Sequence, residues 1–140
     1  MASKDAIASF IRDAFPQTRV VIEAVGPMTA TVSLQVDDSD LRPGGTVSGP
    51  TLMAVADVAL YVAVLGQIGI VPLAVTTSLT INFLRRPEGG RRVIGECQLM
   101  KLGKTLAMGE VSLYSEGLDD PVAHVVGTYA IPPEHLRQVP

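Results

Sequence analysis

Residues 50–65 form an almost unbroken apolar stretch, and this stretch limits the possible folds more than any other part of the chain. Thirteen of its sixteen residues are apolar. We expect a helix that starts at Pro50, because proline suits a first helical position, and that ends at Gly66. Its apolar side chains point in every direction, so neighbouring elements must cover the helix on nearly all sides.

A membrane span is the main alternative for this region. Asp57 lies within the apolar window 52–74, and a charge near the centre of a span costs about 2.5–3.5 kcal/mol on insertion scales. The apolar run before Gly66 is also too short to cross a bilayer. We therefore expect a buried helix and no membrane span.

The rest of the chain supplies strands that can cover this helix. Six segments alternate apolar and polar residues or carry strand-forming residues: 19–25, 29–36, 75–83, 92–102, 105–115 and 121–131. An amphipathic helix of about residues 3–15 precedes them. The pattern predicts an α+β fold, in which an antiparallel β-sheet wraps around one long central helix in a single domain of residues 1–140. One sheet covers only one side of a helix, so the remaining apolar surface predicts pairing with a second copy.

The charged residues are distributed unevenly. The net charge is −3, which gives no support to general nucleic-acid binding. Six of the eleven basic residues nevertheless fall within twenty positions: Arg85, Arg86, Arg91, Arg92, Lys101 and Lys104. This basic zone suits a small polyanionic ligand; the alternative is a solvated sheet edge protected by charge. Cys97 is the only cysteine, which fits a reducing compartment and predicts a cytoplasmic protein.

Asp57 is the one carboxylate of the apolar helix. Burying it unpaired would cost several kcal/mol, so we expect it to line a cleft and to act in acid–base or nucleophilic chemistry. The alternatives are a solvated gap or an arginine partner across a dimer contact. The helix start lies about 10 Å away along the axis and offers free N–H groups that polarise a carbonyl oxygen. One copy cannot easily present both groups to one substrate, so the sequence predicts a site between subunits.

Four segments together resemble the PaaI-like hotdog thioesterases, a family named for phenylacetate degradation. These segments are TVSGPTLMAVAD, AVTTSLTINFLRRP, KLGKTLA and PVAHVVGTY, and the resemblance covers roughly residues 20–131. It implies a hotdog fold whose subunits pair into a continuous double-length sheet, as a homodimer or a homotetramer. The implied activity is hydrolysis of acyl-CoA thioesters to free acid and CoA. No cofactor is implied beyond the coenzyme A that belongs to the substrate.

The resemblance also implies roles for individual residues. Asp57 matches the catalytic carboxylate, and Gly49 matches the glycine that donates its backbone N–H. Thr76, with Thr77 beside it, matches a hydroxyl residue that positions water or substrate. Strict alternation along residues 75–83 instead places Thr77 toward the helix and Thr76 on the other side. The implied substrate and CoA contacts are Ser48, Thr77, Phe83, Arg85, Arg86, Lys101, Gly103, Lys104 and Thr105.

The helix start departs from the family pattern. The family usually has His-Gly-Gly where this chain has Ser48-Gly49-Pro50, and an asparagine of the family is matched by Arg42. The missing histidine motivates an alternative function, a non-catalytic acyl-CoA-binding or scaffold protein on the same fold. It also disfavours water addition to enoyl thioesters, because related hotdog hydratases use a histidine near the helix.

Other constellations add little. His124 and His135 are the only histidines, and His124 lies in a strand pattern where a structural imidazole is expected. No His, Cys or acidic spacing predicts a metal site, and no glycine-rich turn predicts a nucleotide site. Apolar side chains such as Leu60, Tyr61 and Val64 would accept aromatic and medium aliphatic acyl groups alike.

Overall fold

The computed structural model describes residues 1–136 and confirms the predicted α+β architecture. The elements in chain order are α1 (Lys4–Ala14), β1 (Val21–Gly26), β2 (Thr29–Leu34), the 3-10 turn η1 (Asp38–Asp40), β3 (Leu41–Arg42), β4 (Thr46–Val47), α2 (Gly49–Ile68), β5 (Val75–Phe83), β6 (Val93–Leu102), β7 (Leu106–Ser115), β8 (Ala123–Ala130) and the 3-10 turn η2 (Glu134–Leu136). Helix α1 corresponds to the amphipathic helix expected over residues 3–15.

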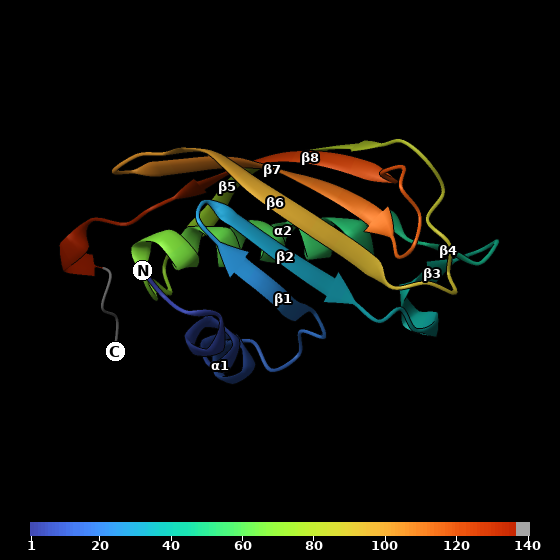
Figure 1. Cartoon of the computed structure of the whole chain (residues 1–140), viewed down its shortest axis with the longest axis horizontal. Helices are drawn as coiled ribbons and strands as arrows, with labels where there is room; N and C mark the ends of the chain where they lie inside the picture. The colour runs from blue at the N-terminus through green and yellow to red at the C-terminus, as the bar shows by residue number, and fades with distance from the viewer. Residues whose placement is uncertain (137–140) are drawn as a thin grey trace.

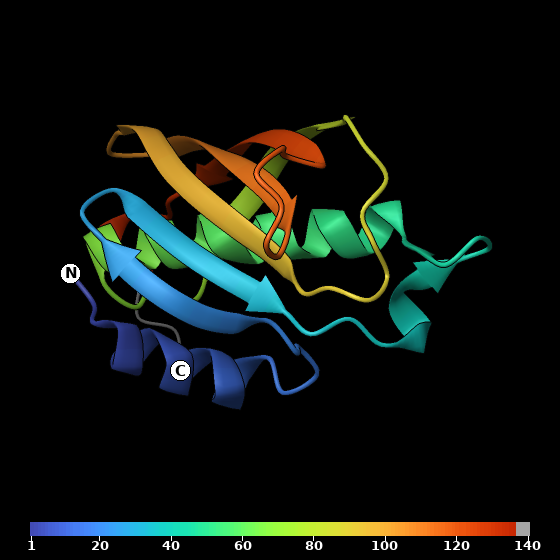
Figure 2. The same ribbon diagram turned by 45° about the vertical axis from the view of Figure 1, so that its right-hand side comes forward.

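Six strands form one antiparallel sheet in the order β1-β2-β6-β7-β8-β5. The sheet curves around α2, and α1 lies against β1 at the lower edge of the view (Figure 1). Strands β3 and β4 form a small separate ribbon near the start of α2 (Figure 2). The central helix wrapped by an antiparallel sheet is the arrangement that the sequence predicts.

Helix α2 is longer than expected at both ends. It begins at Gly49, where the Ser48 Oγ caps it by accepting the Thr51 N–H at 3.4 Å. The prediction that it ends at Gly66 is wrong, because the helix continues to Ile68 and Gly69 ends it with a φ of 92°. Gly66 instead permits close packing, since a Cβ there would lie 2.8 Å from Cγ1 of Val25.

The two halves of α2 differ in how completely the fold covers them. The buried residues are Leu52, Val55, Ala56, Ala59, Leu60, Tyr61, Val62, Ala63, Val64, Leu65 and Gly66. In the first half, Met53 is 38% exposed, Ala54 is exposed, and Asp57 and Val58 are half-buried. Among the described residues only α2 is long and apolar enough to span a membrane, but it is the core helix of this fold. The uncovered face therefore belongs to the half that carries Asp57.

A glycine in β8 brings the sheet close to the helix. Alternate residues of β8 face α2 and are buried, among them Val125 and Tyr129. A Cβ at Gly127 would lie 2.4 Å from Cδ1 of Leu60, so any larger residue would push the strand and the helix apart. This close approach carries Tyr129, two residues further along the strand, onto the helix near Asp57.

The two edge strands of the sheet, β1 and β5, differ in charge and in how far other elements cover them. Strand β1 carries Glu23 and a bulge between Ile22 and Ala24, and α1 packs against it. Strand β5 at the other edge spans nine residues without a charge or a proline, and most of its residues are exposed. A long, uncharged, open edge is a template for pairing with another strand. The β5 edge is therefore the one that is left open for strand pairing.

Candidate functional site

The carboxylate of Asp57 is held by two hydroxyl groups from two strands. Thr76 in β5 donates its Oγ1 proton to Asp57 Oδ1 at 2.6 Å, and Tyr129 in β8 donates to the same oxygen at 2.7 Å. The Tyr129 hydroxyl also lies 3.1 Å from the backbone carbonyl oxygen of Asp57. No hydrogen bond within residues 1–136 involves Asp57 Oδ2. One carboxylate oxygen is thus fixed, and the other remains available.

A bulge in β5 turns Thr76 toward the helix. The register of β5 against β8 shifts between Thr76 and Ser78, so Thr77 is the extra residue. The Thr77 hydroxyl is directed to the backbone carbonyl of Thr128, 3.3 Å away on the neighbouring strand. The strict alternation predicted for this strand is therefore wrong at these two positions, and Thr76, not Thr77, reaches Asp57.

Asp57 opens into a pocket of about 410 Å³, which we call the aromatic pocket. Its lining residues are Ile11, Phe15, Gln17, Thr18, Asp57, Val58, Tyr61, Pro72, Ala74, Val75, Thr76 and Tyr129. Tyr61 stacks on Tyr129 with ring centroids 5.8 Å apart, and Phe15 meets Tyr61 edge-on at 5.9 Å. Burial raises the pKa of Tyr61 to about 12, so its hydroxyl stays neutral. The pocket therefore combines one carboxylate with a largely apolar, aromatic wall.

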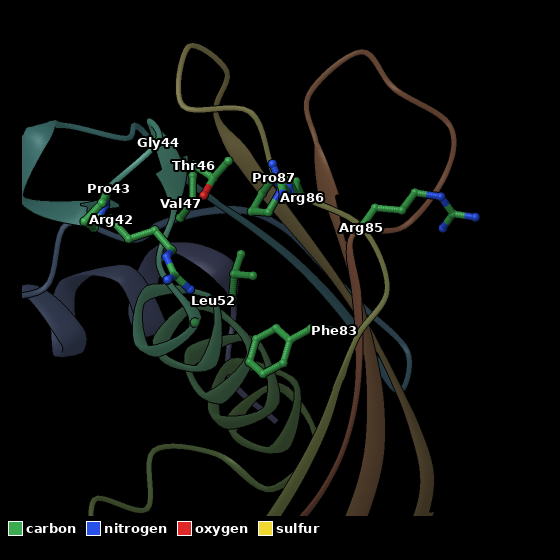
Figure 3. A pocket seen from close by; sticks show the side chains of 11 residues that line it. Arg42, Pro43, Gly44, Thr46, Val47, Leu52, Phe83, Arg85, Arg86 and Pro87 are labelled. Atoms are coloured by element: carbon green, nitrogen blue, oxygen red, sulfur yellow. The ribbon is translucent and has the colours of Figure 1, made fainter.

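Gly49 lines a second pocket of about 400 Å³ at the start of α2, which we call the helix-start pocket. Its other lining residues are Arg42, Pro43, Gly44, Thr46, Val47, Leu52, Phe83, Arg85, Arg86 and Pro87. The Phe83 ring lies beside the helix (Figure 3), and a Cβ on Gly49 would come within 3.1 Å of that ring. No hydrogen bond of the described residues uses the Gly49 N–H, as expected for a first-turn donor. The pocket thus presents a free backbone donor.

Buried Asp40 holds the helix start in place. Its backbone carbonyl accepts the Ser48 N–H at 2.7 Å, and its carboxylate accepts from Arg19 at 2.7 Å and from Thr51 at 3.3 Å. Burial alone would raise the pKa of Asp40, but the hydrogen bonds that its carboxylate accepts from Arg19, the Asp37 N–H and Thr51, together with the Arg19 charge, lower it from its ordinary value. Ser48 itself serves as the cap of α2.

The basic zone predicted from the sequence is not one surface in the fold. Arg85 and Arg86 follow β5 at the helix-start pocket, whereas Lys101 and Lys104 lie at the β6–β7 hairpin at the opposite end of the sheet (Figure 1). The register aligns the hairpin with the Val75 end of β5, because Leu106 and Val75 both pair with Ala130. Eight residues of strand, about 26 Å, separate the two groups. Gly103 and Thr105 lie in the same hairpin as the lysines.

Several of these cations are already engaged. Arg91 pairs with Glu88 at 2.8 Å, and Arg92 pairs with Glu116 and Glu23. Arg85 donates to the Pro121 carbonyl at 2.8 Å and points away from the helix, whereas the Arg42 guanidinium points toward it (Figure 3).

Except for Tyr61, the remaining residues singled out in the sequence whose side chains the structure describes lie away from both pockets. His124 lies 3.3 Å from Glu110 on adjacent strands, and the side chain of His135 lies outside the described residues. Burial raises the pKa of the Cys97 thiol to about 12, as suits a packed thiol. Of the three expected acyl contacts, Tyr61 lines the aromatic pocket, whereas Leu60 and Val64 are core residues. Within residues 1–136 no cluster of three possible metal ligands forms.

Sequence reasoning missed two of the three aromatic residues that line the aromatic pocket, Tyr129 and Phe15. A signal for Tyr129 was present, because it falls on the same face of its strand as Ala123 and Val125. A hydroxyl on a buried face requires a hydrogen-bond partner, and Asp57 was the available acceptor. Phe15 gave no comparable signal, since its place depends on how α1 packs against α2.

Comparison with known proteins identifies the family. The model of the Thioesterase superfamily matches residues 44–122. A search among curated proteins found no match. A candidate thioesterase from Silicibacter sp. TM1040 is 45% identical, with 94% of this chain and 92% of that chain covered and a TM-score of 0.86.

Two phenylacetic acid degradation proteins share the fold. A mutant of PaaI from Thermus thermophilus is 26% identical, with coverage of 87% of this chain and 98% of that chain and a TM-score of 0.72. PaaI from E. coli is 23% identical, with coverage of 91% and 95% and a TM-score of 0.75. Since the family match spans more than half of the chain and these neighbours share its wrapped helix, the chain belongs to the Thioesterase superfamily as a PaaI-like hotdog thioesterase.

Proposed function

We propose that this thioesterase hydrolyses acyl-CoA at a site completed by two subunits. One observation carries the proposal: Asp57 and the Gly49 N–H open into different pockets of the same chain. The two residues are eight positions apart on α2, about 12 Å along the axis. A single thioester carbonyl cannot touch both groups of one copy, so a second copy must supply one of them.

Pairing through the open β5 edge would bring the two groups together. In an antiparallel β5–β5 contact about a two-fold axis, the Val75 end of one strand lies beside the Phe83 end of the other. The Val75 end carries Thr76 and its partner Asp57, and the Phe83 end carries the ring that packs on Gly49. The contact also extends the sheet across both subunits. We propose a homodimer of this kind, or a homotetramer formed from two such dimers.

The chemistry follows from these two groups. The thioester carbonyl oxygen accepts the Gly49 N–H at the positive end of α2, which stabilises the negative charge that develops on that oxygen. Asp57 of the other subunit then attacks the carbonyl carbon directly, or removes a proton from a water that attacks it. In both routes the C–S bond breaks and CoA leaves as a thiolate that gains a proton. In the direct route water hydrolyses the acyl–aspartyl anhydride in a second step.

The basic residues support coenzyme A as the thiol. The two-fold contact that we propose would bring Arg85 and Arg86 of one subunit to the same end as the Lys101–Lys104 hairpin of the other. Cations from two subunits would then flank one site, which suits the phosphates of CoA. The aromatic pocket beside Asp57 would hold the apolar acyl group. A cytoplasmic location, where acyl-CoA is found and a lone thiol stays reduced, fits this proposal.

Mixed dimers test the shared site. Asp57→Asn removes the carboxylate, and Gly49→Pro removes the N–H; Gly49→Ala is the matched control because it adds a Cβ near Phe83 but keeps the donor. Each inactive variant alone should release thiol from acyl-CoA at least about a hundredfold more slowly than the wild type. Co-expressed with two different affinity tags and purified as mixed dimers, they should regain roughly half of the wild-type rate, because one of the two sites is intact.

The outcomes separate the possible failures. Mixed dimers that stay inactive would place both groups in one subunit and overturn the shared site. Wild-type protein that binds CoA but releases no thiol from short, long or aryl acyl-CoA would favour the alternative, a non-catalytic acyl-CoA-binding or scaffold protein. The departures at Ser48 and Arg42 from the family pattern make this control necessary.

A further inference from the structure

We infer that Tyr129 is a positioning residue that fixes Asp57 Oδ1 and leaves Oδ2 as the reacting oxygen. The inference rests on the proposed function, because it assigns Tyr129 a role through Asp57. It goes beyond that function by naming the group that decides which carboxylate oxygen reaches the substrate.

The geometry around Asp57 is asymmetric. Both hydroxyl donors, Thr76 at 2.6 Å and Tyr129 at 2.7 Å, bond to Oδ1. Within residues 1–136 Oδ2 has no hydrogen-bond donor, and Asp57 lines the aromatic pocket. Since an oxygen that accepts two hydrogen bonds has less electron density to donate, Oδ2 is the better nucleophile or base.

Tyr129 is better suited to this role than Thr76. The Tyr129 side chain is only 3% exposed, whereas Thr76 lies on the exposed edge strand. Its ring is stacked on Tyr61, whose hydroxyl is in turn 3.3 Å from the Pro72 carbonyl oxygen. The ring of Tyr129 is therefore held between its own strand, β8, and helix α2. Its hydroxyl, in turn, keeps the Asp57 carboxylate in one position.

The Tyr129 hydroxyl remains a donor at all working pH values. Burial raises the pKa of Tyr129 well above its ordinary value, and the negative charge of Asp57 raises it further. The hydroxyl proton therefore stays in place between the two oxygens, and the hydrogen bond has a constant direction. Gly127, two residues before Tyr129, keeps the strand close enough to α2 for this bond to form.

Tyr129→Phe removes only the hydroxyl and keeps the stacked ring. If Tyr129 positions the carboxylate, kcat for acyl-CoA hydrolysis should fall about tenfold to a hundredfold, because small misplacements of a reacting group cost rates of that size. KM should stay within about twofold, since the pocket shape is kept. Tyr114→Phe is the matched control: Tyr114 lies on the outer face of β7, and its variant should keep the wild-type kcat.

Two further variants keep the test decisive if Phe destabilises the fold. Replacement of Tyr129 by para-aminophenylalanine keeps an N–H donor at the same place, and replacement by para-methylphenylalanine keeps the shape without a donor. We expect the first to retain kcat within about threefold and the second to lose as much as Tyr129→Phe. Equal rates for the two would overturn the inference, as would a loss confined to KM.

The double variant with Asp57→Asn separates this inference from the proposed function. Adding Tyr129→Phe to Asp57→Asn should cause no further loss of rate, because Tyr129 acts only through the carboxylate. A further loss would show that Tyr129 acts independently of Asp57 and would overturn the inference alone. Full activity of Asp57→Asn by itself would overturn the proposed function.

Discussion

The two pockets of this protein lie on one helix and differ in almost every property. The helix-start pocket is made by short loops and the ends of strands, and it offers a backbone N–H with Arg42 and Arg86 around it. The aromatic pocket is made by α1, α2, β5, β8 and two loops, and it offers one carboxylate among tyrosine and phenylalanine rings. In the function that we propose, each pocket supplies one of the two groups that thioester hydrolysis needs.

The difference between the pockets shows why the carboxylate lies away from the helix start. A carboxylate beside a helix N-terminus would bind to the free N–H groups and lose its reactivity, because that end of the helix attracts negative charge. Keeping Asp57 two turns away, under Thr76 and Tyr129, prevents this within one subunit. In the dimer that we propose, a second subunit would bring the donor and the carboxylate together only around the substrate.

The largest expected effect is the loss of kcat when Asp57 in the aromatic pocket is replaced. Asp57→Asn keeps the shape and both hydroxyl contacts but removes the charge, so kcat for acyl-CoA hydrolysis should fall about 10²–10⁴-fold. A steady-state thiol-release assay measures this, and Asp119→Asn in the exposed loop after β7 is the matched control. Turnover unchanged on the best substrate would contradict the assignment of this pocket to catalysis.

The sequence predicts the aromatic pocket less well than the fold. The apolar helix and the six strands are visible as patterns because each depends on local periodicity and on the need to cover α2. The orientation of Thr76 depends on a bulge in β5, which has no marker in the residues 75–83 themselves. The pocket wall also needs Phe15 from α1, whose place is fixed only by tertiary packing.

The cations around the helix-start pocket show a second limit of prediction from the sequence. Clustering of arginines and lysines within twenty positions of sequence indicates a cationic surface, but a β-strand separates residues that are close in the chain. Arg86 and Lys104 therefore end at opposite ends of the sheet. Proximity in the sequence therefore does not show where each cation lies, and only the register of β5, β8 and β7 does.

A smaller effect, on KM, should distinguish the cations that bind the substrate from those that stabilise the fold. Arg86→Gln combined with Lys104→Gln should raise KM for acyl-CoA about fivefold to tenfold with kcat kept, because each exposed charge contributes modestly. The difference should shrink at high salt. Arg91→Gln is the control, since that guanidinium is bonded to Glu88 and the Glu116 carbonyl. Equal effects of the double variant and the control would argue against CoA binding by these residues.

The smallest expected effect is on the stability of the fold, and it concerns Asp40, which supports the helix-start pocket. Asp40→Asn weakens the contact with Arg19, which is itself 44% exposed, so the free energy of unfolding should fall by only about 1–2 kcal/mol. The folded pKa of Asp40 lies below its ordinary value of 3.8. The contribution of the carboxylate is therefore complete above that ordinary value and is lost as the pH falls through the folded pKa.

Urea unfolding of the wild type and of Asp40→Asn, measured from neutral to acidic pH, tests this predicted pH dependence of stability. The stability difference should be constant near neutral pH and should shrink in strong acid, where the wild-type carboxyl is also protonated. The control is Asp38→Asn, which changes an exposed acid two residues away. A difference that grows on acidification would mean that Asp40 is not held as the charged form, and the helix-start pocket would then need another support. Because the Asp40 carboxylate bonds Arg19 and Thr51 and does not contact Asp57, the substitution should leave the aromatic pocket intact.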